Sequence, residues 1–118
     1  MHGFRTLICR PDGGIIKSER DAVDLIGDAM GEQAEVVVIP VERLDDAFFR
    51  LQTRIAGEIM QKFVTYRLLL VIVGDVSRHV AASSALRDFV EETNRGDHVW
   101  FLPGLAELDE RLSLRPSA

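Results

Sequence analysis

The chain has 118 residues, a formal net charge of −5 and 47% hydrophobic residues. Its length predicts one domain, and its apolar fraction excludes an intrinsically disordered protein. The single cysteine, Cys9, excludes an internal disulfide framework. The excess of Asp and Glu argues against a nucleic-acid-binding surface, which needs basic residues.

No segment has the pattern of an export signal or a membrane span. The longest apolar run is Leu68–Val73, much shorter than the roughly 20 residues that cross a bilayer. The first ten residues lack the apolar stretch of about 7–15 residues that a secretory signal needs. We therefore expect a cytoplasmic protein without membrane contact.

The N-terminal part predicts a β-hairpin followed by a helix. Thr6–Arg10 and Ile15–Lys17 are short β-prone runs, and Pro11–Gly14 between them has the composition of a turn. We expect these two runs to pair in an antiparallel manner. Ser18 provides an N-cap for the helix, and Gly31 is its expected stop.

Two continuous apolar runs, Glu35–Pro40 and Arg67–Gly74, are typical of strands that are buried on both faces. Between them, apolar residues recur at helical spacing, which predicts one long helix near Asp46 to Val64. The next segment, Asp75–Ser84, shows no periodicity and is expected to be a polar loop. A third, short helix follows, capped by a serine at position 83 or 84 and ending at Gly96.

The C-terminal part predicts a last strand over His98–Leu102 and a closing helix with leucines at 105, 108 and 112. Strands joined by single helices need right-handed crossovers, which place them in parallel. The order β-β-α-β-α-β-α-β-α therefore predicts an α/β fold with a mixed, largely parallel five-stranded sheet and about four helices. Residues 1–114 should form one domain, and the tail 115–118 should fray.

Several blocks of the sequence carry a family likeness. They are Ala56–Phe63, Tyr66-Arg67, Ile72-Val-Gly-Asp75 with Ser77, Leu86-Arg-Asp-Phe89 and Glu92-Thr-Asn-Arg-Gly96. In this order they resemble the bacterial domain-of-unknown-function family 4180 over nearly the whole chain. Two positions depart from the family pattern: Arg54 stands where a small residue or glycine is expected, and Ala81-Ala82 lengthen a loop. The resemblance implies no particular activity.

The order of elements is also similar to that of the STAS fold, shared by sulfate-transporter cytoplasmic domains and anti-sigma-factor antagonists. That resemblance implies a Ser or Thr at the start of the second helix whose phosphorylation switches partner binding. Thr53 lies nearest to this place and is the candidate phospho-acceptor, although the usual Asp-Ser-Ser-Gly motif is absent.

No constellation of residues indicates catalysis, a cofactor or a metal. His2, His79 and His98 lie far apart, and none has a second ligand at i+3 or i+4. The glycine-rich phosphate-binding fingerprints are missing as well. Asp75, Ser77 and His79 have the composition of a hydrolytic triad, but residues on one loop rarely reach triad geometry.

Ligands of open α/β sheets bind outside the carboxyl ends of the strands. Asp75 and Ser77 follow a buried strand, and Arg87 is positioned to face the same loop. They form a candidate rim for a small molecule or a partner. The alternative interpretation makes Asp75 an ordinary turn residue and Arg87 a surface residue.

Glu58 and Lys62 have the i,i+4 spacing of a helical ion pair, and Arg54 with Glu58 repeats it. These residues form either a solvated ion pair or a polar patch that binds a ligand or partner. Gly57 lies inside this helix, where glycine costs up to about 1 kcal/mol relative to alanine. We expect close packing of the helix at Gly57, or a contact between protomers.

The leading hypothesis is a non-enzymatic regulatory or protein-interaction module of STAS-like type, with a protein partner or a second copy as its ligand. The alternative is a small-molecule-binding protein or small enzyme that uses the rim near Asp75, Ser77 and Arg87. No cofactor, nucleic acid or membrane is expected as a partner.

Overall fold

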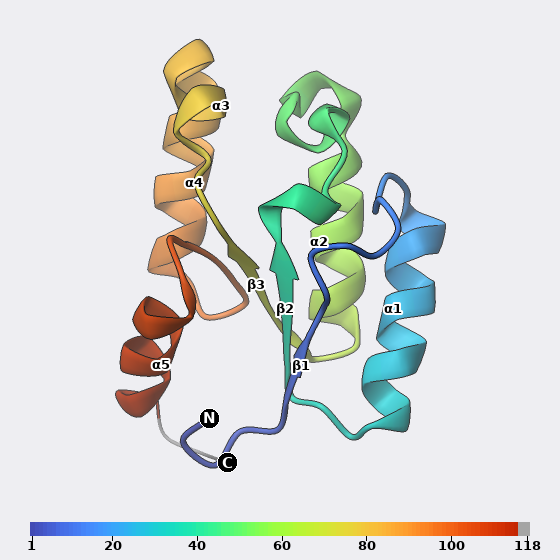
Figure 1. The fold of residues 1–118 in the computed structure, drawn as a ribbon. Coiled ribbons are helices and arrows are strands. Elements are labelled where there is room, and N and C mark those ends of the chain that lie inside the picture. Colours follow the sequence, from blue (N-terminus) through green and yellow to red (C-terminus); the bar gives the residue numbers. More distant parts are fainter. Residues whose placement is uncertain (116–118) are drawn as a thin grey trace.

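A computed structural model describes residues 1–115 and shows a four-stranded parallel sheet (Figure 1). The strands lie in the order in which they occur along the chain. They are β1 (Thr6–Ile8), β2 (Val36–Pro40), β3 (Leu69–Val73) and β4 (Val99–Leu102). The α/β class and the parallel pairing of the central strands agree with the prediction, but the sheet has four strands and not five.

Five α-helices connect and follow the strands (Figure 1). They are α1 (Glu19–Gly31), α2 (Ile55–Thr65), α3 (Ser77–Ala82), α4 (Ser84–Arg95) and α5 (Leu105–Ser113). Two of the predicted caps are present, since the hydroxyl of Ser18 accepts a hydrogen bond from Asp21 N and that of Ser83 accepts one from Leu86 N. In the described part of the chain, no helix has both the length and the apolar character needed to cross a membrane.

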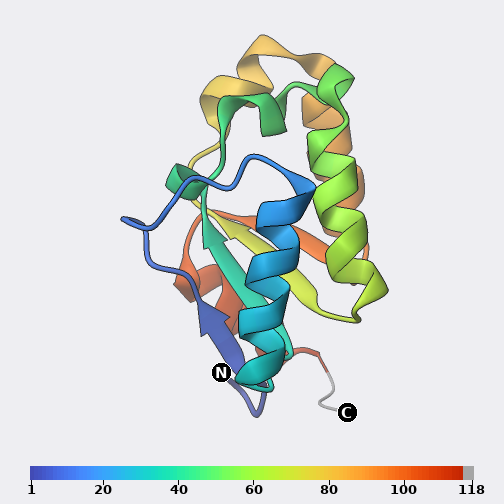
Figure 2. The same ribbon diagram turned by 90° about the vertical axis from the view of Figure 1, so that its right-hand side faces the viewer.

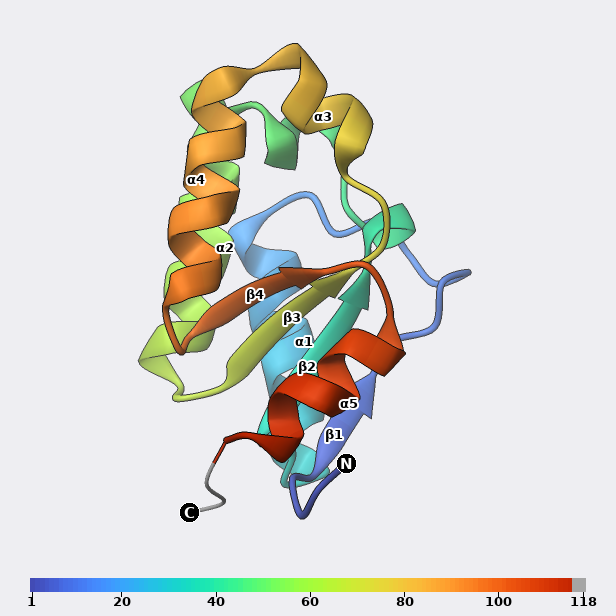
Figure 3. The same cartoon turned by 90° about the vertical axis from the view of Figure 1, so that its left-hand side faces the viewer.

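Both faces of the sheet are covered by helices. Figure 2 shows α1 and α2 in front of the sheet, and Figure 3 shows α5 across its opposite face. Because successive strand residues point to opposite faces, the strands supply two separate cores. Val37, Leu70 and Ile72 join the core under α1, α2 and α4, whereas Val71 and Trp100 join the core under α5.

The predicted antiparallel hairpin at the N-terminus is wrong. β1 pairs with β2 in parallel, with Leu7 opposite Val37. Ile16 forms only an isolated parallel bridge to Leu44, so the second β-prone run does not become a strand. The turn-like segment 11–14 instead carries the chain from β1 to α1, and Arg43 fixes it by donating hydrogen bonds to the carbonyls of Arg10 and Gly14.

The long helix predicted near Asp46 to Val64 is also wrong in its first half. Two short 3-10 turns, Asp46–Phe49 and Leu51–Thr53, precede α2. Arg54 separates them from α2 with a left-handed backbone, φ 63°. A 3-10 turn brings residues three apart onto one side, so apolar spacing alone does not distinguish these turns from an α-helix.

Two smaller predictions also differ from the structure. The segment 75–84 contains the short helix α3 rather than a loop throughout. Gly31 does not stop α1, because the helix includes it and Gln33 takes the left-handed conformation, φ 57°. Arg115, the first residue of the tail that is predicted to fray, donates a hydrogen bond from its guanidinium to the carbonyl of Asp97. The remaining tail, 116–118, lies outside the described residues.

The outer edge of β4 is paired by a side chain. The amide of Asn94, on α4, accepts a hydrogen bond of 2.7 Å from Phe101 N and donates one of 3.1 Å to Phe101 O. The edge at β4 is therefore partly closed by the chain itself, whereas the edge at β1 has no such side-chain pairing in the described part of the chain.

Candidate functional site

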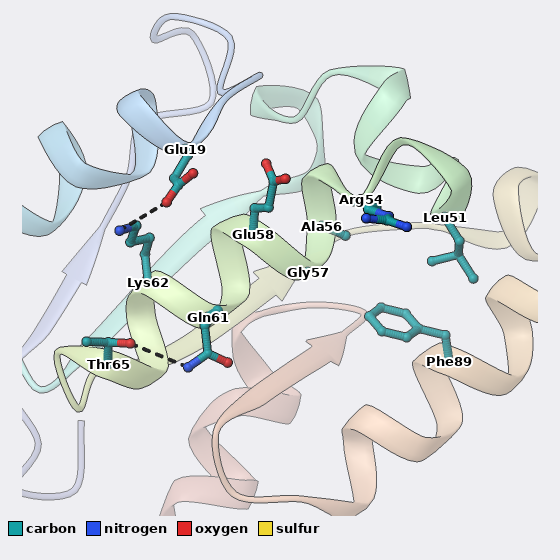
Figure 4. A pocket seen from close by; sticks show the side chains of 10 residues that line it. All are labelled: Glu19, Leu51, Arg54, Ala56, Gly57, Glu58, Gln61, Lys62, Thr65 and Phe89. Atoms are coloured by element: carbon teal, nitrogen blue, oxygen red, sulfur yellow. Dashed lines mark hydrogen bonds and ion pairs between the residues drawn. The ribbon is translucent and has the colours of Figure 1, made fainter.

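A groove runs along α2 on the side that faces α4 (Figure 4). Its volume is about 620 Å³, and Gly57 and Ala56 of α2 line it together with Leu51 and Phe89. The six remaining lining residues are all polar: Glu19, Arg54, Glu58, Gln61, Lys62 and Thr65. Figure 4 shows the ring of Phe89, on α4, facing α2 across the groove.

The groove continues toward the other end of α4. A second hollow of about 320 Å³ shares Gly57, Gln61 and Phe89 with the first and is also lined by Met60 and Val64. The helix α2 packs closely on α1 but only weakly on α4. The groove therefore exists because α2 and α4 stand apart, with partly buried apolar side chains between them.

Gly57 leaves the groove open at its centre. A Cβ atom placed on Gly57 would meet nothing within 4 Å, and the residue is exposed. The predicted close packing of Gly57 on the sheet or on another helix of the chain is therefore wrong. Nothing in the described part of the chain requires a glycine here, although glycine weakens the helix.

The predicted ion pair between Glu58 and Lys62 is not formed. Lys62 reaches across to α1 and lies 3.0 Å from a carboxylate oxygen of Glu19. The hydrogen bond and the charge of Glu19 raise the pKa of Lys62. In the described part of the chain, the side chains of Arg54 and Glu58 form no ion pair, so the second predicted i,i+4 pair is also absent.

Thr53 lies two residues before the start of α2. Its hydroxyl is 2.7 Å from Ala47 O and 2.8 Å from Arg50 O, to which it donates, and it accepts a hydrogen bond from Ile55 N. The side chain thus ties the preceding turns to the first turn of α2. The candidate phospho-acceptor is half-buried and is next to the left-handed Arg54.

Arg54, where a small residue or glycine is expected, has a backbone conformation that suits glycine. A residue with φ 63° lies in the left-handed region, where glycine meets no steric cost and other residues cost about 1–2 kcal/mol. Arg54 keeps this turn and places a charged side chain at the end of the groove.

The three residues of the predicted strand-end rim are not brought together as a site. Asp75 accepts a hydrogen bond of 2.8 Å from Ser77 N, and the hydrogen bonds from Ser77 lower the pKa of the Asp75 carboxyl. The Nε atom of Arg87 lies 3.8 Å from the Oδ1 atom of its neighbour Asp88. Within residues 1–115, no hydrogen bond or ion pair joins Arg87 to Asp75 or Ser77.

A different pocket occupies the strand-end region, and the sequence did not predict it. It has a volume of about 570 Å³ and lies between α3 and the turns before α2. Arg78 pairs with Asp46 at 3.1 Å, and the ring of His79 stacks on Phe49 at 4.0 Å. Arg50 lines the same pocket. These residues come from two segments about 30 positions apart, so no local spacing signals the pocket.

His79 is the unusual residue of this pocket. Its Nε2 atom is buried and has no hydrogen-bond partner in the described structure. Burial lowers the pKa of the imidazole, and the charge of Arg78 lowers it further. Buried polar atoms are usually paired, so this lone Nε2 is an exception, and its surroundings disfavour the charged imidazolium.

The other titratable residues do not gather into a metal site. His2 lies 3.0 Å from Asp109, while Cys9 is buried and burial raises the pKa of its thiol. Within residues 1–115, no group of three His, Cys, Asp or Glu side chains is arranged to hold a metal ion.

A protein-family model matches residues 1–112. The chain belongs to the family described as Domain of unknown function (DUF4180). Comparisons with curated proteins and with solved structures found no match. Two residues in the blocks that resemble DUF4180 have a structural role. Gly74 has φ +142° and lies against Val41, where a side chain would not fit. Asn94 forms two hydrogen bonds with Phe101 at the edge of β4.

Proposed function

We propose that this DUF4180 chain is a non-enzymatic regulatory module that binds a protein partner in the groove between α2 and α4. The observation that carries the proposal is the open groove at Gly57. An apolar groove with polar residues at its border is the usual anatomy of a protein-contact surface.

The arrangement of the polar groups favours a protein over a small molecule. Small-molecule sites direct a few polar groups at one point inside a concave pocket. In the groove Lys62 is paired with Glu19, and Figure 4 shows its side chain turned to Glu19 and away from Phe89. The apolar surface extends along two helices, as a helix or a loop of a partner requires.

Thr53 supports a regulatory role of STAS-like type. A phosphate adds about −1.5 to −2 charges at neutral pH. Phosphorylation of Thr53 would remove the proton that its hydroxyl donates to Ala47 O and Arg50 O. The turns that lead into α2 would then rearrange next to Leu51 and Arg54, which line the groove.

Partner capture from a lysate of the source cells tests the groove. Gly57→Leu fills it without a clash in the chain, since nothing lies within 4 Å of the added Cβ. Gly27→Leu is the matched control, because Gly27 is an exposed helical glycine with the same open surroundings but outside the groove. We expect partners to be lost with Gly57→Leu alone.

Two results would contradict the proposal. Equal recovery of partners by both variants would place the contact elsewhere. Turnover of a small molecule by the purified chain would show an enzyme. Phosphopeptide mass spectrometry of the chain from its own cells, with Thr53→Val as the negative control, tests the regulatory part separately.

A second candidate function uses the strand-end pocket. Arg50 and Arg78, which line this pocket, favour a small anionic ligand in the chemical class of carboxylates or phosphates. A thermal-shift screen with such compounds would show stabilisation that Arg50→Ala weakens and Arg87→Ala leaves unchanged. The absence of any shift with the unmodified chain would remove this candidate.

A further inference from the structure

We propose that the partner in the groove is a second copy of this chain, with the two α2 helices crossing antiparallel near Gly57. This inference rests on the proposed function, because it names the partner of the same groove. Three observations support it: the open surface at Gly57, a pair of unpaired opposite charges beside it, and the charge balance of the groove.

Gly57 permits a close approach that no other residue would allow. Helix axes usually pack 8–10 Å apart, at a distance set by the side chains at the contact. Gly57 is exposed, and the space where its side chain would lie is empty. A second α2 crossing at this point would bring the two backbones together and cover Phe89 and Leu51, which form the walls of the groove.

Arg54 and Glu58 supply the charge complementarity. They carry opposite charges on the two sides of Gly57, and both are exposed. Neither side chain has an ion-pair partner in the described part of the chain. In a two-fold contact residue i meets residue j and residue j meets residue i, so Arg54 of each copy would face Glu58 of the other.

The helical rise makes this pairing feasible. When the two-fold axis passes through Gly57, Glu58 of the second copy lies at the same height as position 56 of the first copy. At 1.5 Å per residue it is offset from Arg54 by about 3 Å along the helix. An arginine side chain spans that offset. The two ion pairs would form together, because the same operation generates both.

The groove is also the place where two copies of an acidic chain can meet without repulsion. The chain carries a net charge of −5. The charged residues of the groove are two acidic and two basic side chains: Glu19, Arg54, Glu58 and Lys62. Like charges that face each other across an interface oppose association. The groove has no excess of either charge, so it does not oppose the contact between two copies.

Sedimentation equilibrium across a range of micromolar concentrations tests the inference. We expect the unmodified chain to have twice the mass of one chain. Arg54→Glu and Glu58→Arg should each return it to the single mass, because each places like charges opposite one another. The double variant Arg54→Glu/Glu58→Arg should restore the doubled mass. Arg87→Glu, on α4 outside the groove, is the matched control and should remain doubled.

Circular dichroism of each variant establishes that it is folded. A single mass for the unmodified chain at every concentration would overturn the inference, as would a doubled mass for both single variants. Other results separate this inference from the proposed function. If the unmodified chain is single but Gly57→Leu alone loses partners in the capture experiment, the groove binds another protein. If neither assay responds to changes in the groove, both proposals are wrong.

Discussion

At Gly74 the backbone takes a conformation that only glycine adopts readily. Its φ is +142°, and an added Cβ would lie 2.9 Å from the side chain of Val41. Gly74 N also donates a hydrogen bond to Leu102 O, so the residue cannot move away without loosening β3 from β4. This glycine is fixed by its surroundings, unlike Gly57.

Gly74→Ala should therefore destabilise the chain by about 1–3 kcal/mol, the usual cost of a residue held in an unfavourable backbone region. Chemical denaturation measures this change. Gly14→Ala is the control, because nothing lies within 4 Å of its added Cβ, and we expect it to be neutral or slightly stabilising. Equal effects of the two variants would refute the role assigned to Gly74.

The imidazole of His79 should make stability depend on pH. Its pKa is lowered in the folded chain, so the unfolded chain binds the proton more readily. The contribution of neutral His79 to the free energy of unfolding is therefore fully present above the ordinary pKa of 6.5. It is lost as the pH falls below that value. Asp46 and Arg78 are the charged groups beside His79.

Denaturant midpoints measured from about pH 8 to about pH 5 test this expectation, because histidine changes its charge in this range. His79→Phe keeps the stacking on Phe49 and should flatten the profile. His98→Gln, at an exposed position, should leave the profile of the original chain. A steep profile that persists in His79→Phe would assign the effect to another group.

At the scale of the elements, α2 depends on the side chain that precedes it. The hydroxyl of Thr53 bonds both to the 3-10 turns and to Ile55 N. Thr53→Val keeps the shape but removes these bonds, and the loss of a hydrogen bond of this kind costs about 0.5–1.5 kcal/mol. Thr53→Ser retains the hydroxyl and should cost less. Urea denaturation of the two variants compares their free energies of unfolding, and equal losses would contradict the role of the hydroxyl.

The elements that sequence analysis predicted well have local signals. Ser18 and Ser83 are caps, and β2 and β3 are continuous apolar runs. The predicted hairpin was wrong because strand pairing depends on contacts between distant parts of the chain. Thr6–Ile8 pairs with β2, which follows α1 in the chain. The break at Arg54 has no signal in residue type, since arginine is a good helix former.

The candidate site was predictable only in part. The sequence placed Glu58, Lys62 and Gly57 on one helix and indicated a contact between protomers as one reading of the glycine. It could not show that Lys62 pairs with Glu19 of another helix. Nor could it show that Phe89 lies across from α2, since both depend on how distant helices sit on the sheet.

At the scale of the whole molecule, the core under α5 rests on few residues. Leu108 and Leu112 are both fully buried against the sheet, whereas Leu105 of the same helix is 41% exposed. Trp100 beneath them donates its indole N–H to Gly96 O, and Arg111 lies 4.0 Å above its ring.

Leu108→Ala should cost about 2–5 kcal/mol, as expected for a buried leucine. Leu105→Ala, a control in the same helix, should cost far less. Thermal unfolding followed by tryptophan fluorescence measures both, because Trp100 is the only tryptophan and lies in this core. Similar midpoints for the two variants would show that α5 contributes little to the fold.

The amide of Asn94 at the outer edge of β4 has a consequence for aggregation. An uncovered strand edge is a template on which strands of other molecules can add, in the manner of amyloid. Because Asn94 occupies both outward-facing backbone groups of Phe101, fibrils should not nucleate readily at this edge. A change at Asn94 would remove that protection as well as two hydrogen bonds, and would leave the apolar Val99–Leu102 strand open to strands of other molecules.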